Sequence, residues 1–328
     1  MKAKGRILSA MMCIGLLTWL GMGLMPGDAA AKTLYRMSSG SAGGVYQILG
    51  AGMAKVVSQY APDIDMTAIT PPNVNQIPQL IESGQVIVGI GMVDMMNRAA
   101  KGLEEFKGRK YTKIVPILAM YDNAMAYLVL KNSPIISIKD VSGRRMSASS
   151  QYTKFLAAET LKAAGVDPDK VKWRFMSYQE GAEALSDGNI DVEPVTGFPK
   201  SGLVDQVMST KGARFVEIDE ATRQAFNKVH PTNLMMETPP NTYTGQTKSA
   251  WGHGVYTVLY GLDSADPQVI YKIVKAILDH PEDISAVHPS GKYITPERTK
   301  IYIEQKLINP AQLHPGAQRY FKEKGIIK

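Results

Sequence analysis

The sequence predicts an α/β fold made of two lobes with a cleft between them. Two observations support this prediction. Along residues 32–328, apolar runs of strand length alternate with helical patterns, which favours an α/β architecture with largely parallel sheets. The order strand, Ser-rich loop, helix, strand, helix, strand occurs twice, and extended crossovers join the two units. Ligands of such sheets bind outside the carboxyl ends of the strands, so a site is expected between the lobes.

The first unit follows directly from residue 32. Its expected strands lie near residues 34–37, 66–69 and 86–92, and its expected helices over 45–60, 74–82 and 95–101. The helix over 45–60 has Val45, Leu49 and Met53 on one apolar stripe. Gly84 is expected to end the second helix, and Asp94 to cap the third.

The second unit begins after two apolar runs, residues 114–120 and 124–130, which Tyr121-Asp122-Asn123 separates. It begins with a strand and a Ser-rich loop over 145–150, and its further expected elements are a helix at 154–164, a strand at 172–176, a helix at 179–187 and a strand at 191–195. We therefore expect lobe 1 to contain residues 32–122 plus 250–328 and lobe 2 to contain residues 123–249. Bending is expected in the crossovers near residues 121–124 and 235–250.

Residues 1–31 are typical of a cleaved signal peptide. Lys2, Lys4 and Arg6 precede a mostly apolar run over 7–24, and Ala29-Ala30-Ala31 gives the small-residue cleavage pattern. A retained membrane anchor is the alternative, but glycines interrupt the run, and a spanning helix needs about 20 apolar residues. The expected location is therefore periplasmic, with the mature chain starting at Lys32.

Composition excludes several classes of site. Cys13 is the only cysteine and lies in the leader, so the mature chain has no disulfide, thiolate metal site or catalytic cysteine. The net charge of the whole chain is +7, and its Lys and Arg residues are scattered, so no nucleic-acid partner is indicated. We expect a monomer without a cofactor or a metal.

A small-residue loop, Ser38-Ser39-Gly40-Ser41-Ala42-Gly43-Gly44, stands between the first strand and the first helix. Helices begin with unpaired N–H groups and a positive dipole end, and serine hydroxyls add further donors. Such a loop can hold a carboxylate or phosphate without a charged side chain. Read alone, it is equally compatible with a tight turn that binds nothing.

Motifs along the whole mature chain resemble one family. They are Gly43-Gly44-Val45-Tyr46 with Leu49-Gly50, Val88-Gly89-Ile90 with Asp94, Leu128–Lys131 with Gly143-Arg144-Arg145, Gly197-Phe198-Pro199, and Leu313–Tyr320. Together they are similar to the TAXI-type solute receptors of TRAP transporters. The resemblance implies the two-lobed type II periplasmic binding protein fold, a small-molecule ligand, and a membrane permease as partner.

Three loops depart from the family pattern. Thr70-Pro71-Pro72-Asn73 stands where the family usually has a Thr-Gly-Gly-Ser-like turn, and Met92-Val93 where Gln-Ser is common. Ser150-Gln151-Tyr152-Thr153 replaces a Gly-Ser-Gly-Thr loop. Ligands of better-studied members, such as glutamate-like amino acids, therefore do not transfer directly. A smaller, flatter or more apolar carboxylate is expected.

The candidate ligand contacts come from two facing loops and from the cleft walls. The first loop supplies Ser39, Gly40, Ser41, Gly43 and Tyr46; the second supplies Ser149, Ser150, Gln151, Tyr152 and Thr153; the walls supply Asn73, Val93, Asp94, Tyr121, Phe198 and Tyr243. For each aromatic residue the alternative is ordinary core packing, because aromatics supply large apolar area wherever they lie. For Asp94 the alternative is a helix cap.

No local motif of the sequence points to catalysis, although Ser, His and Asp residues from distant positions could still assemble in the fold. Four of the five histidines precede proline, which favours turns, and no helical zinc pair or Gly-x-Ser-x-Gly elbow occurs. Gly40, Gly43 and Gly44 have the wrong spacing for a dinucleotide fingerprint.

We therefore expect a protein, not an enzyme, that captures a small organic anion (a carboxylate or amino-acid-like compound) and delivers it to a TRAP-type permease. The alternative is a periplasmic sensor that docks on a signalling kinase.

Overall fold

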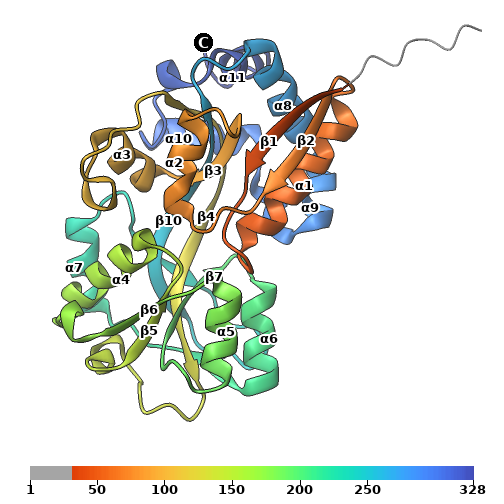
Figure 1. Cartoon of the computed structure of the whole chain (residues 1–328). Helices are drawn as coiled ribbons and strands as arrows, with labels where there is room; N and C mark the ends of the chain where they lie inside the picture. Colours follow the sequence, from red (N-terminus) through yellow and green to blue (C-terminus); the bar gives the residue numbers. More distant parts are fainter. Residues whose placement is uncertain (1–31) are drawn as a thin grey trace, which may run out of the picture. The chain divides into compact units, whose positions relative to one another are not determined.

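A computed structural model describes residues 32–328 (Figure 1). The predicted signal peptide and Cys13 lie outside the described residues. Within residues 32–328, no helix combines the length and the apolar character needed to cross a membrane.

The first unit has the predicted order of elements. They are β1 (Thr33–Ser38), α1 (Val45–Tyr60), β2 (Ile64–Ile69), the 3-10 turn Val74–Gln76, α2 (Ile77–Glu82), β3 (Val88–Met92) and α3 (Val93–Lys101). The stripe of α1 is buried, with Leu49 and Met53 fully covered. Gly84 follows α2 with φ of 71°, as expected for a helix end.

Asp94 does not cap α3, contrary to the prediction. The helix begins at Val93, with Met92 as its N-cap and no capping side chain, so Asp94 lies inside the first turn. Its carboxylate instead accepts hydrogen bonds from Tyr152 and Arg98. Tyr152, which bonds Asp94 in place of a capping contact, lies 58 positions away in the chain, so the local sequence does not reveal it.

Two long strands form the centre of the main sheet, β4 (Ile114–Leu130) and β10 (Ala250–Leu262). The two apolar runs predicted around Tyr121-Asp122-Asn123 are thus one continuous strand. Its polar residues have tertiary partners: Asp122 accepts from Arg298 and Tyr302, and Asn123 donates to Tyr46. Because these partners satisfy the side chains, the strand need not break.

The sheet is mixed and not largely parallel, which corrects a second prediction. Its strand order is β2-β1-β3-β10-β4-β7, with β8 added to β4 and β9 to β10. β1 pairs parallel with β2 and β3, whereas every pairing of β4 and β10 is antiparallel. The paired long strands impose this direction on the strands beside them.

The second unit repeats the first in its arrangement as well as in its order. It contains β5 (Arg145–Ala148), α4 (Gln151–Ala163), β6 (Lys172–Phe175), α5 (Tyr178–Ser186) and β7 (Glu193–Phe198). β5 pairs parallel with β6 and makes a bridge from Met146 to Val192, just as β1 lies between β2 and β3. α6 (Gly202–Lys211), β8 (Ala213–Phe215), α7 (Glu220–Val229) and β9 (Met235–Thr238) follow.

The C-terminal segment returns to the first unit, where it packs beside α1 (Figure 1). Its helices are α8 (Pro267–Asp279), α9 (Pro281–Val287), α10 (Pro296–Glu304) and α11 (Pro315–Glu323). The His-Pro pairs at 280, 288 and 314 begin helical turns there: each histidine is the N-cap and each proline the first helical residue. Sequence reasoning expected turns at these pairs but did not foresee the helix starts.

Candidate functional site

A cavity lies where the N-termini of α1, α4 and α5 meet the sheet. Its solvent-fillable volume is about 40 Å³, enough for roughly three water molecules at about 10–15 Å³ each. The lining residues are Ser41, Gly44, Val45, Tyr46, Val74, Met92, Asn123, Met125, Tyr152, Thr153, Tyr178, Thr196, His253 and Val255. They come from both predicted units, which are thus brought together at this one place.

The floor of the cavity follows from strand alternation. His253 is paired with Met125, and Val255 with Asn123, across the antiparallel β10–β4 ladder. Since alternate residues of a strand point to the same face, these four side chains share the face that carries the cavity. Thr196 joins them from β7, where it is paired with Met125.

The roof of the cavity is made of helix beginnings. α1 starts at Val45 with Gly44 as N-cap, and neither a capping side chain nor an acidic residue occupies its first turn. Tyr152 and Thr153 lie in the first turn of α4, and Tyr178 is the first residue of α5. Ser150 caps α4, and a capping box of Ser177 and Glu180 closes α5. The first N–H groups of an uncapped helix lack intrahelical acceptors and carry partial positive charge. At the roof it is therefore the start of α1 that favours negative charge in the cavity.

Ser41 adds an unused donor to this roof. Its side chain lines the cavity, the residue is 3% exposed, and its hydroxyl has no hydrogen-bond partner among residues 32–328. Buried hydroxyls without partners are uncommon because each costs about 1–3 kcal/mol. A ligand oxygen placed beside Ser41 and the start of α1 would satisfy both.

Tyr46 is held in place by a buried hydrogen-bond network. Asn123 Nδ2 donates to the Tyr46 hydroxyl at 2.9 Å, and that hydroxyl lies 2.7 Å from Thr257 Oγ1. Tyr121 packs edge-on against the Tyr46 ring, with 6.0 Å between centroids. Asn123 Nδ2 also donates to Thr257 Oγ1 at 3.3 Å, so the three side chains form one closed network. Burial raises the pKa of Tyr46, so its hydroxyl stays protonated within this network.

Tyr152 reaches across from α4 to α3. Its hydroxyl donates to Asp94 Oδ1 at 2.8 Å, and Arg98 holds the other carboxylate oxygen at 2.9 Å. Arg98 also bonds Glu105, which completes a partly buried chain of charges behind the cavity wall. Burial and the nearby Asp94 carboxylate raise the pKa of Tyr152. Tyr152 thus stays a neutral donor that joins the two units.

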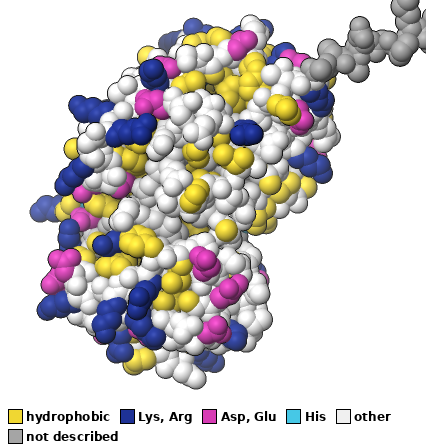
Figure 2. Space-filling model, viewed as in Figure 1, with side chains coloured by type: hydrophobic (Ala, Val, Ile, Leu, Met, Phe, Trp, Pro, Cys, Tyr) yellow, Lys and Arg dark blue, Asp and Glu magenta, His cyan; other side chains and the backbone are white. Residues whose placement is uncertain are grey.

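His253 is neutral at working pH. Burial, together with the nearby His230, lowers the pKa of His253 to about 3. Its Nδ1 lies 3.4 Å from the hydroxyl of Tyr127. With His253 uncharged, no lining residue of the cavity carries a charge near neutral pH. The middle of the face in Figure 2 likewise shows mainly uncharged and hydrophobic side chains.

Four of the predicted ligand residues line the cavity: Ser41, Tyr46, Tyr152 and Thr153. Others lie directly beside it. Gly40 packs under the Cβ of Tyr46, and Gly43 lies against the backbone nitrogen of Gln179 in α5. Ser149 bonds the hydroxyl of Thr153, and Ser150 caps α4.

The remaining predicted residues have other surroundings. Ser39 donates to the carbonyl of Ile69, and Asn73 caps the 3-10 turn at 74–76. Val93 is buried in α3, Asp94 lies behind Tyr152, Tyr121 lies behind Tyr46, and Gln151 is exposed. Phe198 lines a separate surface hollow, and Tyr243 bonds the Ser201 N–H and the Thr196 carbonyl. A ligand role for these residues stays a prediction.

Sequence reasoning missed the floor residues, chiefly Asn123, Met125, Thr196, His253 and Val255. The alternation of residues along two adjacent strands was the signal that could have found them. Using it required the β4–β10 register, which depends on residues more than 100 positions apart.

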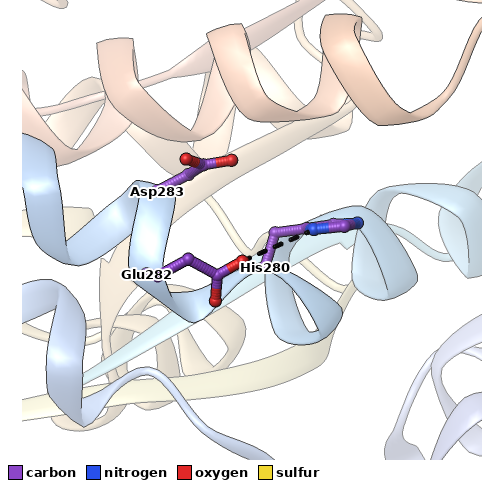
Figure 3. Close-up of side chains that lie close together, drawn as sticks. All are labelled: His280, Glu282 and Asp283. Carbon is purple, nitrogen blue, oxygen red and sulfur yellow. Dashed lines mark ion pairs between the residues drawn. The ribbon is translucent and has the colours of Figure 1, made fainter.

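A second cluster, His280, Glu282 and Asp283 at the start of α9, brings three potential metal ligands within 4.8 Å of one another (Figure 3). Protein contacts already engage them. The Tyr60 hydroxyl donates to Asp283 at 2.7 Å, the Tyr60 ring stacks on His280 at 3.4 Å, and His280 lies 3.7 Å from Glu282. No further observation points to an ion, so we base no proposal on this cluster.

Residues 37–325 match the NMT1-like family, which is nearly the whole described chain. The chain belongs to the NMT1-like family. One stretch of 210 residues is also 24% identical to the DNA-directed RNA polymerase subunit beta' of Wigglesworthia glossinidia brevipalpis. That stretch spans 62% of this chain but only 14% of the polymerase subunit, so it carries no argument about fold or function.

Solved structures share the fold of this NMT1-like chain. The alkanesulfonate-binding protein SsuA of Xanthomonas axonopodis pv. citri has a TM-score of 0.50 at 12% identity, over 88% of this chain and 99% of that one. The ligand-binding component of an ABC-type import system from Staphylococcus aureus has a TM-score of 0.52 at 12% identity, over 88% and 98%. The predicted α/β fold of the type II periplasmic binding proteins is thereby confirmed.

Proposed function

We propose that this protein captures a small organic anion outside the cytoplasmic membrane and delivers it to a TRAP-type permease. The anion would enter the cavity between lobe 1, residues 32–122 plus 250–328, and lobe 2, residues 123–249. Family membership and fold support a binding role. The TAXI-like motifs Gly43–Tyr46 and Leu313–Tyr320 support the choice of permease.

The observation that carries this proposal is the start of α1 beside Ser41. An uncapped helix N-terminus and a buried hydroxyl without a partner face the same uncharged cavity. Partial positive charge with unused donors suits a carboxylate, a sulfonate or another oxyanion. Among residues 32–328 the His253 imidazole bonds Tyr127 and no hydroxyl of the cavity lining, so no base is paired with a nucleophile there, and binding is the activity that the cavity supports.

Closure would act through contacts that join α4 and α5 to the first unit. Tyr152 bonds Asp94, its N–H donates to Asn75 Oδ1 at 3.3 Å, and Gly43 packs on Gln179. Each of these contacts would break if the lobes separated. A ligand that bridges the helix starts would favour the closed form, which the permease would then recognise.

The first test is a thermal-shift screen of the purified protein against carboxylates and sulfonates. A ligand at one hundred times its Kd adds about 2.7 kcal/mol of stability, which is readily measured. Ser41→Ala should weaken binding of a hit about tenfold, since it removes one hydrogen bond to a charged group. Ser290→Ala is the matched control, because Ser290 is also a buried serine whose hydroxyl has no partner within residues 32–328, but it does not line the cavity.

Failure of every anion to bind the folded protein would refute the proposal. Delivery is tested separately, by measuring binding of the ligand-loaded and ligand-free protein to purified TRAP-type permease subunits. Binding to a kinase sensor domain, with none to the permease, would contradict delivery while leaving capture intact.

A further inference from the structure

The cavity has two chemically different ends. At the roof, Ser41 and the start of α1 offer hydrogen-bond donors and partial positive charge. At the floor, Asn123, Met125, Thr196 and His253 are all uncharged. A ligand with its anionic group at the roof therefore places its second functional group against neutral partners.

Every carboxylate near the floor is turned away or already engaged. Asp94 is bonded to Tyr152 and to Arg98, which balances its charge. Asp122, beside Asn123 in β4, points to the other face of the sheet, where it bonds Arg298 and Tyr302. Neither residue lines the cavity.

Glu193 is the remaining acidic residue of the floor strands. Its carboxyl is buried in β7 and has no hydrogen-bond partner among residues 32–328. It packs against Gly181 in α5, where a glycine leaves room for it, and it does not line the cavity. Burial raises the pKa of Glu193 well above its usual range, which disfavours its charged form. None of the described residues that line the cavity thus offers a negative charge to the floor.

An ammonium group would be poorly accommodated there. Burying an ammonium without a carboxylate partner costs several kcal/mol, because neutral acceptors repay only part of its hydration. A keto or hydroxyl group loses much less hydration and can bond the Thr196 hydroxyl or the neutral imidazole of His253. The Asn123 amide N–H groups are engaged by Tyr46 and Thr257, so Asn123 offers only its carbonyl oxygen, to a ligand hydroxyl. The α1 start also attracts the anionic end of either kind of ligand, so it does not discriminate between them.

We infer that this cavity selects monoanionic carboxylates that carry a keto or hydroxyl group and rejects the corresponding amino acids. This inference rests on the proposed capture function and narrows the ligand class that the sequence left open as carboxylate or amino-acid-like. The small volume of the cavity favours short skeletons in the closed form.

The test compares ligands that differ only at the second carbon. Isothermal titration calorimetry would use pyruvate, lactate and alanine, then 2-oxoisocaproate, 2-hydroxyisocaproate and leucine, then phenylpyruvate, phenyllactate and phenylalanine. Any other carboxylate found in the thermal-shift screen would be paired with its 2-amino counterpart. We expect the keto or hydroxy acid to bind at least 30-fold more tightly than its amino acid. An amino acid that binds within threefold of its partner, or more tightly, would overturn the inference but leave anion capture standing.

A designed variant tests the cause. Asn123→Asp introduces a carboxylate of the same shape at the floor, and Thr196→Asp introduces one from the neighbouring strand. In either folded variant, the ratio of the amino-acid Kd to the keto-acid Kd should fall at least tenfold. An unchanged ratio in a folded variant would overturn the inference. Absence of binding by every compound would remove the proposed function and this inference together.

Discussion

Replacing Tyr152 with phenylalanine removes a single oxygen atom from the junction between α4 and α3. The ring would still line the cavity, but Asp94 would lose a 2.8 Å hydrogen bond and keep only Arg98. Hydrogen bonds to charged groups contribute about 1.5–3 kcal/mol. If the lobes are separated before ligand binds, this bond forms only on closure, and its whole loss appears in affinity. The expected Kd of Tyr152→Phe is therefore about 10 to 150 times that of the native protein.

Calorimetry would give the Kd, and small-angle X-ray scattering would report lobe separation with and without ligand. Tyr320→Phe is the matched control. The Tyr320 hydroxyl also donates to a carboxylate, Asp279 Oδ1 at 2.7 Å, but it joins two C-terminal helices and does not line the cavity. That variant should lose stability without losing affinity.

A Kd of Tyr152→Phe within twofold of the native value would refute the reasoning. It would mean that the bond to Asp94 is either absent from the ligand-bound form or equally present before binding. Equal weakening by Tyr320→Phe would also refute it, because the loss would then reflect general destabilisation.

Three further predictions concern the surroundings of the cavity. Gly43→Ala should weaken binding measured by calorimetry, because a Cβ there would lie 2.8 Å from the backbone nitrogen of Gln179. Gly84→Ala is its control: the φ of Gly84 is similar, +71° against +78° at Gly43, but apart from its two chain neighbours no residue of 32–328 has an atom within 4 Å of the added Cβ. Gly84→Ala should therefore leave the affinity unchanged. Thr257→Val should lower the free energy of unfolding in urea by about 1–2 kcal/mol, since the hydroxyls of Tyr46 and Thr257 bond each other; an unchanged midpoint would contradict this. The pKa of His253 in the folded state, about 3, lies below its ordinary value of 6.5. Between these two pH values the unfolded chain binds a proton that the folded chain does not bind. The stability that is present above pH 6.5 is therefore lost as the pH falls towards 3. Between pH 6.5 and 4.5, the native protein should lose about 2–3 kcal/mol more than His253→Gln, at about 1.4 kcal/mol per pH unit; parallel curves would show that His253 does not titrate in this way.

The elements that local patterns define were predictable from sequence. α1 begins and ends at Val45 and Tyr60 as expected, because its apolar stripe and the glycines before it are both local signals. The two similar units were also visible, since alternation of strands and helices needs no knowledge of distant contacts. The same local signals located the Ser41 loop and Tyr152, which line the cavity.

Features that depend on distant partners were not predictable. In the sequence, Tyr121-Asp122-Asn123 predicts a break between two apolar runs, because three polar or half-polar residues in succession weaken a strand pattern. Arg298, Tyr302 and Tyr46 satisfy these side chains from elsewhere in the chain, and the strand continues. His253 had no functional signal in sequence either, since its place in the cavity follows only from pairing with Met125.

The β4–β10 pair has a mechanical consequence for any motion of the two units. Its ladder runs unbroken from the His253–Met125 pair to the Tyr256–Asp122 pair, beside the cavity, and the first irregularity follows between Tyr256 and Val258. A protein that flexes at a loose linker can open widely, but a hydrogen-bonded pair of strands deforms mainly by elastic twisting and bending. We therefore expect the two units to rotate relative to each other by only a small angle and to return elastically. The backbone amides at 123–125 should keep slow hydrogen exchange through every binding cycle.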